Sequence, residues 1–424
     1  NWWRIDAQVY NIGPTRANTN TKPKLFVYRV VPYNVHSSRL MPAGKRAPGY
    51  DQLKLQAVKE YNYIYTGANT DILKFEIKYI NVPKSKRTIF SMVYSILRRL
   101  GFRTIFDAFN EKYLREVSII ITENLDFKSP TLFVGITPYI NFSGTNYFIF
   151  NDCDFNTYLD FYTVRKKFNT KHLSKLIQKE VKFLENSKGI FYTSSWAKER
   201  SIKFLGLDEN KIFITKQGGN IPTEKSQSLI KTTGVLKFVF ISTDFNKKGG
   251  EIALSFVKRL NKIMSAELII YGSPPTIKID NSNMYYRGWI NKDNKIEVEE
   301  LISTYSEAFG LILPTQADIL PLSIIEAGYF GCPSFTTDIG AIPTLIKNGE
   351  NGFTYNINDF INNMIADVVE LRKDTTRYNQ IRNNTKKHFK EHYNWSSFGT
   401  VITNQILNEI NTNSRRWNVE FFLD

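Results

Sequence analysis

The stretch that decides the fold is Asp318-Ile-Leu-Pro321-Leu-Ser323-Ile-Ile-Glu326-Ala-Gly328-Tyr-Phe-Gly331-Cys-Pro333, which places two carboxylates eight positions apart across the start of a predicted helix. Pro321 suits a first helical turn, because its missing N–H costs nothing there. The backbone amides of Leu322 and Ser323 then lack helical partners, and together with the helix dipole they favour an anion such as a diphosphate. Glu326, one turn further in, is able to accept both hydroxyls of a ribose, and Asp318 in the preceding loop is placed to meet a sugar.

This run resembles the Glu-x7-Glu motif of glycosyltransferase family 4, whose members are retaining enzymes of the GT-B class. The resemblance implies that Glu326 holds the ribose of a nucleotide sugar, that Asp318 contacts its sugar, and that Leu322 and Ser323 bind its diphosphate. Asp318 departs from the family, which usually has Glu there, so its carboxylate is one methylene shorter. The structural alternative is an ordinary amphipathic helix that begins at a proline and ends at a glycine.

A second run, Phe240-Ile-Ser242-Thr243-Asp-Phe-Asn-Lys247-Lys248-Gly249-Gly250, is predicted to form a strand, a loop and a helix start. It resembles the family's Lys-Gly element, in which the lysine grips the donor diphosphate, and this register selects Lys248 as the catalytic cation with Lys247 one position away. A point charge on a flexible stem is able to follow a departing diphosphate. Ile241-Ser242 stands where many members have Gly-Arg, so the hydroxyls of Ser242 and Thr243 are expected to replace that cation. The alternative is a solvated turn.

Two strand ends follow in the family's order. Ile270-Tyr271-Gly272-Ser273 resembles its Ile-x-Gly segment, and Tyr286-Arg287-Gly288-Trp289 resembles its Phe-x-Gly segment, where the backbone often meets the nucleotide base. The resemblance therefore implies that Gly272, Gly288 and Trp289 border the donor.

Two later segments and two earlier ones complete the resemblance. Thr337–Pro343 and Lys347–Phe353 resemble the Gly-Gly-x-Pro-Glu and Asn-Gly-x-x-Gly elements, with Thr344 where Glu is usual. In the first half, Glu180–Trp196 and Lys211–Asn220 resemble the last part of the family's acceptor domain. That likeness places Gly219 and Asn220 at the cleft.

Length and pattern indicate two domains of parallel α/β structure. A chain of 424 residues is too long for one ordinary core, and 42% hydrophobic residues supply enough apolar material for two. Short β-branched and aromatic runs alternate with helical patterns, which is typical of doubly wound sheets. The expected fold is GT-B, with Rossmann-like domains at 1–220 and 235–395, an interdomain cleft, a polar linker from Asn220, and a helix at 396–424 that crosses back to the first domain. The predicted strands are Lys24–Val31, Ser118–Thr122, Thr131–Ile136, Tyr147–Phe150, Gly189–Thr193, Lys211–Lys216, Leu236–Ser242, Glu267–Tyr271, Met284–Arg287, Ala308–Leu313 and Pro333–Thr336.

The cysteines and the hydropathy of the sequence indicate the cellular compartment of the protein. Cys153 and Cys332 are the two cysteines, and both lie in or beside apolar stretches, which indicates buried thiols and a reducing compartment. No apolar run approaches the ~20 residues of a membrane span, and Asn1-Trp2-Trp3-Arg4 does not open a signal peptide. The expected location is the cytoplasm, or the inner face of the membrane as a peripheral protein.

Asn151-Asp152-Cys153-Asp154 contains a carboxylate pair just after a predicted strand. In GT-A glycosyltransferases such a pair holds Mg²⁺ or Mn²⁺ against the donor diphosphate, since hard oxygen ligands suit these cations. Alternatively, Asp152 at the strand end contacts the acceptor or the sugar, or an aspartate caps the following helix. Because the rest of the chain is GT-B in character and shows no Cys/His metal spacing, Walker loop, Gly-x-Gly-x-x-Gly or Gly-x-Ser-x-Gly, we expect neither a metal nor a cofactor.

The net charge of +16 implies attraction to something anionic. Two basic stretches could account for it. One runs from Lys84 to Arg103 and has cations at both ends of an apolar middle, as interfacial helices do, and the other runs from Arg165 to Lys175. They are read either as solvated surface helices or as docking sites on anionic lipid.

The sequence therefore predicts a retaining, metal-independent glycosyltransferase that moves a sugar from a nucleotide-diphosphate donor to a hydroxyl of a glycan or lipid-linked acceptor. The setting is expected to be cell-surface polysaccharide or glycoconjugate synthesis. Two alternatives stay open, namely a non-catalytic nucleic-acid- or membrane-binding scaffold on a degenerate GT-B fold and a DNA glucosyltransferase, although nucleic acid is not the expected partner.

Overall fold

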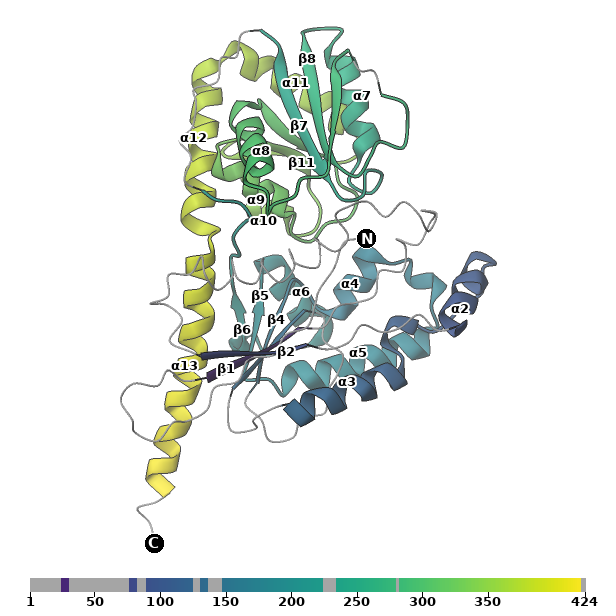
Figure 1. Ribbon diagram of the computed structural model, residues 1–424, viewed down its shortest axis with the longest axis vertical. Coiled ribbons are helices and arrows are strands. Elements are labelled where there is room, and N and C mark those ends of the chain that lie inside the picture. Colours follow the sequence, from purple (N-terminus) through teal and green to yellow (C-terminus); the bar gives the residue numbers. More distant parts are fainter. Residues whose placement is uncertain are drawn as a thin grey trace. The chain divides into compact units, whose positions relative to one another are not determined.

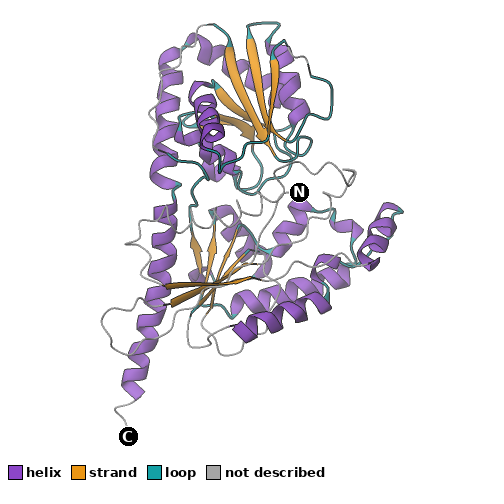
Figure 2. Ribbon diagram, viewed as in Figure 1, coloured by secondary structure: helices purple, strands orange, loops and turns teal. Residues whose placement is uncertain are grey.

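The computed structural model describes residues 24–29, 76–81, 89–124, 130–135, 147–223, 234–279 and 282–420. The chain divides into two compact units (Figure 1). The C-terminal unit contains Lys216–Ser397, and the N-terminal unit contains the described parts of Trp3–Ser38, Ile64–Thr215 and Phe398–Asp424. Each unit has its own sheet and its own covering helices (Figure 2).

The C-terminal unit is built on a six-stranded sheet whose order is β12-β11-β10-β7-β8-β9. Every neighbouring pair is parallel. The chain runs outward from β7 through β8 to β9 and then returns to the other side of β7 as β10, so the strand order reverses between β7 and β10. The strands are β7 (Leu236–Ser242), β8 (Ala266–Gly272), β9 (Met284–Gly288), β10 (Gly310–Leu313), β11 (Ser334–Thr337) and β12 (Gly352–Tyr355).

Helices follow the strands of this unit as the parallel connections require. Helices α7 and α11 pack against each other, and α12 packs against α9. Aromatic side chains fill the space under the sheet: Phe335 stacks on Phe353 with ring centroids 5.0 Å apart, and Phe309 stacks on Tyr378 at 4.3 Å. The helices are α7 (Gly250–Leu260), α8 (Lys295–Glu307), α9 (Leu322–Tyr329), α10 (Ile342–Leu345), α11 (Phe360–Lys373) and α12 (Thr375–His392).

The N-terminal unit has a second six-stranded parallel sheet, in the order β2-β1-β3-β4-β5-β6. From Phe398 onward α13 belongs to this unit: the ring of Phe398 lies edge-on to Phe150 at 5.0 Å, and Glu409 pairs with Lys188 at 3.1 Å. The strands are β1 (Lys24–Arg29), β2 (Glu76–Asn81), β3 (Thr131–Val134), β4 (Tyr147–Asn151), β5 (Gly189–Tyr192) and β6 (Ile212–Ile214). The helices are α2 (Ile89–Arg99), α3 (Glu111–Asn124), α4 (Phe155–Tyr162), α5 (Thr170–Glu185), α6 (Ser195–Leu205) and α13 (Trp395–Glu420).

The predicted fold class is confirmed, because both units are parallel α/β structures with the strand reversals of doubly wound sheets. The predicted strand at Ser118–Thr122 is wrong, since these residues lie in α3. Their β-branched character is overridden by a longer pattern: Tyr113, Val117 and Ile121 are buried at a spacing of four residues, which is the period of one helix face. Strands β2 and β12 were not predicted. The limits of the domains and of the linker remain predictions, and residues 224–233 of that linker lie outside the described part.

Two further expectations concern the thiols and the membrane. Cys153 and Cys332 are both buried and unbonded, and burial raises the pKa of the Cys332 thiol to about 12. Within the described ranges, none of the helices combines the length and the apolar character that crossing a bilayer requires.

Candidate functional site

Two predicted site residues meet where the strand order of the C-terminal sheet reverses. Lys248 follows β7 and Asp318 follows β10, and these two strands are neighbours. The ammonium of Lys248 pairs with the carboxylate of Asp318 and also donates to the carbonyl oxygen of Ala317 at 3.3 Å. In open α/β sheets, ligands bind outside the carboxyl ends of the strands at such a reversal. Two motifs read separately in the sequence therefore converge on one place.

The loop that carries Lys248 is fixed by its own backbone. Asp244 accepts from the amide of Lys247 through Oδ1 at 3.1 Å and from the amide of Lys248 through its carbonyl oxygen at 3.0 Å. Gly249 has φ 78°, and a Cβ at this position would lie 2.0 Å from the carbonyl oxygen of Pro314. Only glycine combines that backbone angle with so close an approach of the β10 loop. The glycine thus holds the loops of Lys248 and Asp318 together.

Helix α9 begins at Leu322, one residue later than the first-turn position predicted for Pro321. Pro321 is instead the N-cap residue, and its carbonyl oxygen accepts from the amide of Ile324 at 3.1 Å. The amides of Leu322 and Ser323 have no hydrogen-bond acceptor among the described residues. Both are thus available to an anion, as the sequence predicts, although their role in binding stays a prediction.

Glu326 is a buried carboxylate with a partner that the sequence did not reveal. Its side chain is 2% exposed, and its Oε1 accepts from Nζ of Lys292 at 2.6 Å and from the amide of Asn220 at 2.9 Å. The backbone of Gly219 lies against it, because a Cβ there would be 2.7 Å from Cγ of Glu326. The hydroxyl of Tyr329, one turn along α9, accepts from the amide of Gly219 at 2.7 Å. The predicted residues Gly219, Asn220 and Glu326 are therefore brought together.

Two hydroxyls at the carboxyl ends of β7 and β10 are buried and have no hydrogen-bond partner among the described residues. They are Oγ of Ser242, a predicted donor residue, and Oγ1 of Thr315, which was not predicted. Buried polar groups are almost always hydrogen-bonded, so each of these two hydroxyls is available to a ligand or to an ordered water. Lys247 lies in the same loop as Lys248. Burial is the main cause that lowers the pKa of Lys247; the charge of Lys248 lowers it further, and Asp244 opposes both.

The remaining predicted donor residues lie on the adjacent strands. Gly272 has φ 93°, and a Cβ there would lie 1.8 Å from the carbonyl oxygen of Ser242, so this glycine brings the end of β8 against the end of β7. Gly288 ends β9 with φ 85°, and Trp289 after it is 45% exposed. Thr243 follows Ser242 in the β7 loop.

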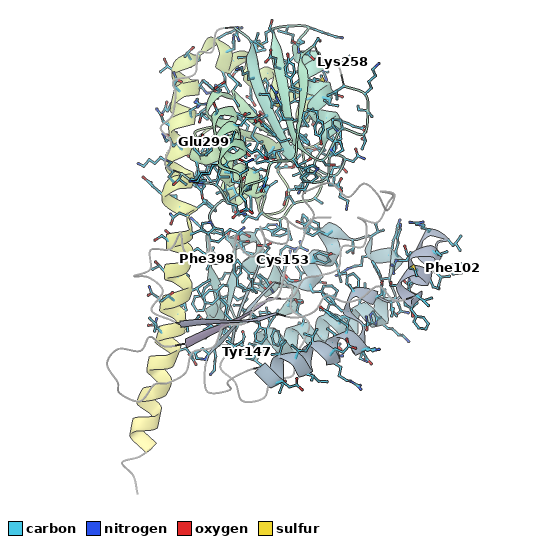
Figure 3. The ribbon with its side chains drawn as sticks, viewed as in Figure 1. Phe102, Tyr147, Cys153, Lys258, Glu299 and Phe398 are labelled. Atoms are coloured by element: carbon cyan, nitrogen blue, oxygen red, sulfur yellow. The ribbon has the colours of Figure 1, made fainter. Side chains whose placement is uncertain are left out.

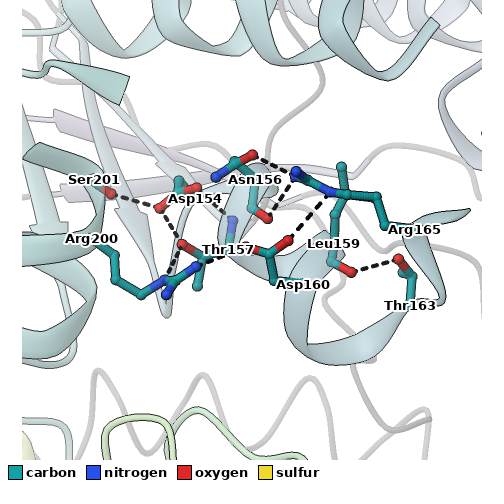
Figure 4. Close-up of polar contacts among 9 residues, drawn as sticks. All are labelled: Asp154, Asn156, Thr157, Leu159, Asp160, Thr163, Arg165, Arg200 and Ser201. Atoms are coloured by element: carbon teal, nitrogen blue, oxygen red, sulfur yellow. Dashed lines mark hydrogen bonds and ion pairs between the residues drawn. The ribbon is translucent and has the colours of Figure 1, made fainter. Parts of the chain in front are cut away.

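In the N-terminal unit, Asp154 caps a helix (Figure 4). Its carboxylate accepts from the amide and the hydroxyl of Thr157, both at 2.8 Å, and from Oγ of Ser201 at 2.8 Å. The carboxylate of Asp154 is therefore engaged by neutral donors and caps the helix, which is one of the alternatives that the sequence left open. No three His, Cys, Asp or Glu side chains gather as potential metal ligands in the part of the chain that the structure describes. Asp152 remains a predicted acceptor residue.

The sequence missed two buried polar residues near Asp152. Asn151 ends β4 and is 1% exposed, and neither its Nδ2 nor its Oδ1 has a partner in the described part of the chain. Thr193 directly follows the neighbouring strand β5, is also 1% exposed, and has an unpaired hydroxyl. Three unsatisfied atoms thus lie at the carboxyl ends of two adjacent parallel strands, where such sheets bind ligands. The spacing of the residues along the chain gives no sign of this.

The apolar stretch between Lys84 and Arg103 forms α2, whose single buried residue is Arg98. The Arg98 guanidinium donates to Oγ1 of Thr104 at 2.8 Å and pairs with Asp107 at 2.9 Å. Arg98 is one of the cations expected at the C-terminal end of the stretch from Lys84 to Arg103, and the expectation that it faces lipid or solvent is wrong, because its guanidinium anchors the helix internally. Lys84, Lys86 and Arg87 lie outside the described residues. Seven large apolar side chains of this region are exposed, and Figure 3 labels the last of them: Ile89, Phe90, Met92, Val93, Ile96, Leu100 and Phe102.

The second basic stretch, from Arg165 to Lys175, is engaged in ordinary surface contacts. Arg165 pairs with Asp160 at 3.3 Å, and Lys175 pairs with Glu111 at 2.9 Å. Exposed pairs of this kind contribute little to stability and indicate a solvated face.

Comparison with known proteins finds a family that part of the C-terminal unit matches. Residues 236–374 match the family described as glycosyl transferases group 1. A protein of 41.2 kDa from the cps region of Klebsiella pneumoniae is 23% identical over 174 residues, which are 39% of this chain and 46% of that protein. The chain thus spans about half the length of that relative.

Solved glycosyltransferases share the arrangement of the elements. TarM of S. aureus, crystallised with UDP and alpha-GlcNAc-glycerol, superposes with a TM-score of 0.51 at 14% identity, over 69% of this chain and 59% of that one. WaaG, a glycosyltransferase involved in lipopolysaccharide biosynthesis, gives 0.55 at 13% identity, over 83% and 95%. Sucrose-phosphate synthase from Thermosynechococcus elongatus gives 0.53 at 13% identity, over 71% and 79%. The chain therefore has the GT-B fold of two parallel α/β units, and its residues 236–374 match the glycosyl transferases group 1 family.

Proposed function

We propose that the protein is a retaining glycosyltransferase that moves a sugar from a nucleotide-diphosphate donor to a hydroxyl acceptor. The observation that carries the proposal is the meeting of Lys248 and Asp318 at the strand reversal of a glycosyl transferases group 1 domain. A cation, two unpaired helix amides and two buried carboxylates lie in the loops and the helix that follow β7 and β10. These are the groups that an anionic diphosphate, a ribose and a sugar require.

Each residue has a role that its surroundings support. Lys248 leaves Asp318 to stabilise the negative charge that grows on the departing diphosphate, while the amides of Leu322 and Ser323 hold the diphosphate at the start of α9. Glu326 accepts ribose hydroxyls through Oε2, which has no partner among the described residues, because Oε1 is already occupied. Asp318, once separated from Lys248, contacts the transferred sugar.

The proposed step needs no nucleophile from the protein. The bond from the anomeric carbon to the diphosphate oxygen breaks, and the acceptor oxygen forms a new bond to that carbon on the same face. The acceptor proton passes to the departing diphosphate, so charge and atoms balance without a histidine base. Retention follows because both bonds involve one face of the sugar.

We place the acceptor on the N-terminal unit, beside Asn151 and Thr193. An amide offers donors and an acceptor, and a hydroxyl offers both, so this pair suits the neutral hydroxyls of a glycan. The relatives make polysaccharide or glycoconjugate synthesis the favoured setting, since one is encoded in a cps region and WaaG takes part in lipopolysaccharide biosynthesis.

We further propose that α2 rests on anionic lipid beside a lipid-linked acceptor. Most of the large apolar side chains of α2 are exposed to solvent. Arg99 at the C-terminal end of the helix and Arg103 shortly after it are exposed as well. Apolar side chains next to cations match the interface of an anionic bilayer.

The test is donor hydrolysis together with ligand-induced stabilisation. An active transferase leaks donor sugar to water, and a ligand that binds the folded state alone raises Tm. We expect one nucleoside diphosphate in a panel of UDP, ADP, GDP, CDP and dTDP to raise Tm, and its sugar conjugates to be hydrolysed slowly. If every nucleotide left Tm unchanged and no conjugate were hydrolysed, the scaffold alternative would hold instead.

A further inference from the structure

Glu326 is buried and Lys292 is partly exposed, and their ion pair leaves one carboxylate oxygen and two ammonium N–H groups unused. Oε1 of Glu326 accepts from Nζ of Lys292 at 2.6 Å and from the amide of Asn220 at 2.9 Å, whereas Oε2 has no partner among the described residues. Lys292 is 20% exposed, and Glu326 is its one acceptor in the described part of the chain. An ammonium has three donors, so two N–H groups of Lys292 remain. A free acceptor and free donors therefore lie side by side.

Lys292 is held in this position by its own loop. The amide of Asn291 donates to Oε2 of Glu297 at 2.6 Å, and the amide of Asp293 donates to Oδ1 of Asn291 at 3.0 Å. Asn294 caps α8 and donates to Oε1 of Glu297 at 2.8 Å. Backbone bonds on both sides of Lys292 thus fix the direction from which it approaches Glu326. A surface lysine that paired with Glu326 by chance would not require a backbone fixed by these hydrogen bonds.

A pair of neighbouring hydroxyls matches this arrangement. One hydroxyl donates to Oε2 of Glu326, and the other accepts from Nζ of Lys292. The two hydroxyls of a ribose stand on adjacent carbons and are able to reach both groups, whereas a deoxyribose has lost one of them. A carboxylate without the lysine would have to accept from both hydroxyls. The lysine adds a donor, so the site is able to accept from one hydroxyl of the diol and to donate to the other.

We infer that Lys292 is a second ribose-binding residue, and that the Glu326–Lys292 pair selects ribonucleotides over deoxyribonucleotides. This inference rests on the proposed function, because it deepens the recognition of the same nucleotide donor. A site that hydrogen-bonds a hydroxyl rejects the analogue that lacks it, since its own buried polar group is left unpaired.

Titration calorimetry tests the inference with UDP, ADP and GDP and their 2′-deoxy and 3′-deoxy analogues. The proteins are the wild type, Lys292→Met, Lys292→Arg and the control Lys295→Met, which removes an exposed lysine of the same segment. We expect Lys292→Met to weaken the ribonucleotide about tenfold or more. For the one deoxy analogue that lacks the hydroxyl facing Lys292, wild type and Lys292→Met should bind within about twofold of each other. Lys292→Arg should recover part of the discrimination, and Lys295→Met should match the wild type.

The outcomes separate the inference from the proposed function. If Lys292→Met weakened all three sugars by the same factor, Lys292 would only position Glu326, and the inference would be overturned while the donor site stood. Unchanged affinities in Lys292→Met would overturn it equally. If the wild type bound dTDP but no ribonucleoside diphosphate, the inference would fail while the proposed function stood, and if it bound none of UDP, ADP, GDP, CDP and dTDP, both would fail.

Discussion

The ammonium of Lys248 is ion-paired with the carboxylate of Asp318, although 70 positions separate them in the chain. The two residues belong to motifs that the sequence presents independently, one after β7 and the other after β10. Their pairing brings together the cation that we propose to bind the diphosphate and the carboxylate that we propose to contact the sugar. The proposed function therefore requires the donor to separate this pair, with the diphosphate replacing the carboxylate as the countercharge of Lys248.

The charge of Lys248 should matter most as the diphosphate departs. We expect Lys248→Ala to lower kcat about a hundredfold or more, with a smaller change in donor KM, because the interaction grows toward the transition state. Steady-state kinetics of donor hydrolysis measure this. Lys247→Ala is the matched control in the same loop and should change kcat only severalfold. The opposite ranking of the two variants would move the catalytic role to Lys247.

The unpaired hydroxyl of Thr315 should serve the donor rather than the fold. Thr315→Val keeps the shape of the side chain and removes a buried polar atom that has no partner, so Tm should stay the same or rise. Donor affinity should fall by about 0.5–1.5 kcal/mol, the net value of one neutral hydrogen bond. Thr336→Val is the control, because its hydroxyl donates to the carbonyl oxygen of Leu313 at 2.8 Å, and it should lower Tm. Full donor affinity in Thr315→Val would remove Thr315 from the site.

Binding of α2 to lipid should depend on Arg99 and Arg103. Cations near an anionic surface contribute about 1 kcal/mol each, so the double change to Gln should weaken sedimentation with anionic vesicles by about 2 kcal/mol. Binding should be absent with neutral vesicles and fall steeply with added salt. Changing Lys171 and Lys182 to Gln removes two exposed cations of α5 and should have less effect. Equal loss in both double variants would show that net charge acts without a specific surface, and binding to duplex DNA in place of vesicles would favour a nucleic-acid partner.

His388 on α12 should make the C-terminal unit less stable in mild acid. Burial, followed by the charges of His392, Lys216 and Lys347, lowers the pKa of His388 to about 4. Between that value and the usual 6.5 the unfolded chain binds a proton that the folded chain does not, so stability falls as pH is lowered through this window. Tm measured from pH 7 to pH 5 should therefore drop less in His388→Gln than in the wild type. Parallel curves for the two proteins would contradict this account.

The sequence predicted most of the parallel strands, because buried strands are short apolar runs bounded by turns. It failed at Ser118–Thr122 for a physical reason: a window with four β-branched residues hides the helical period that runs from Tyr113 to Ile121. Arg98 was misplaced for a related reason, since a cation at the end of an apolar helix looks exposed until Thr104 and Asp107 fold back onto it.

The candidate site likewise contains residues that the sequence predicted and residues that it did not predict. Local motifs predicted Lys248, Asp318 and Glu326, because each of these residues lies in a short run of sequence that also contains the loop or the helix start that positions it. Lys292 could not be found, since its pairing with Glu326 joins the loop after β9 to α9 and exists only in the folded chain. Thr315, Asn151 and Thr193 escaped for a different reason, namely that an unsatisfied hydroxyl or amide is a property of the folded surroundings.

The most direct test of the central claim is calorimetric titration of wild type and Glu326→Ala with nucleoside diphosphates. The account predicts that at least one of UDP, ADP, GDP, CDP and dTDP binds the wild type and loses about 1.5–3 kcal/mol of binding free energy in the variant, the scale of a hydrogen bond to a charged group. Circular dichroism of both proteins establishes that the fold is intact. Unchanged affinity in a folded Glu326→Ala, or no binding of any of the five by the wild type, would contradict a nucleotide site at the reversal of β7 and β10.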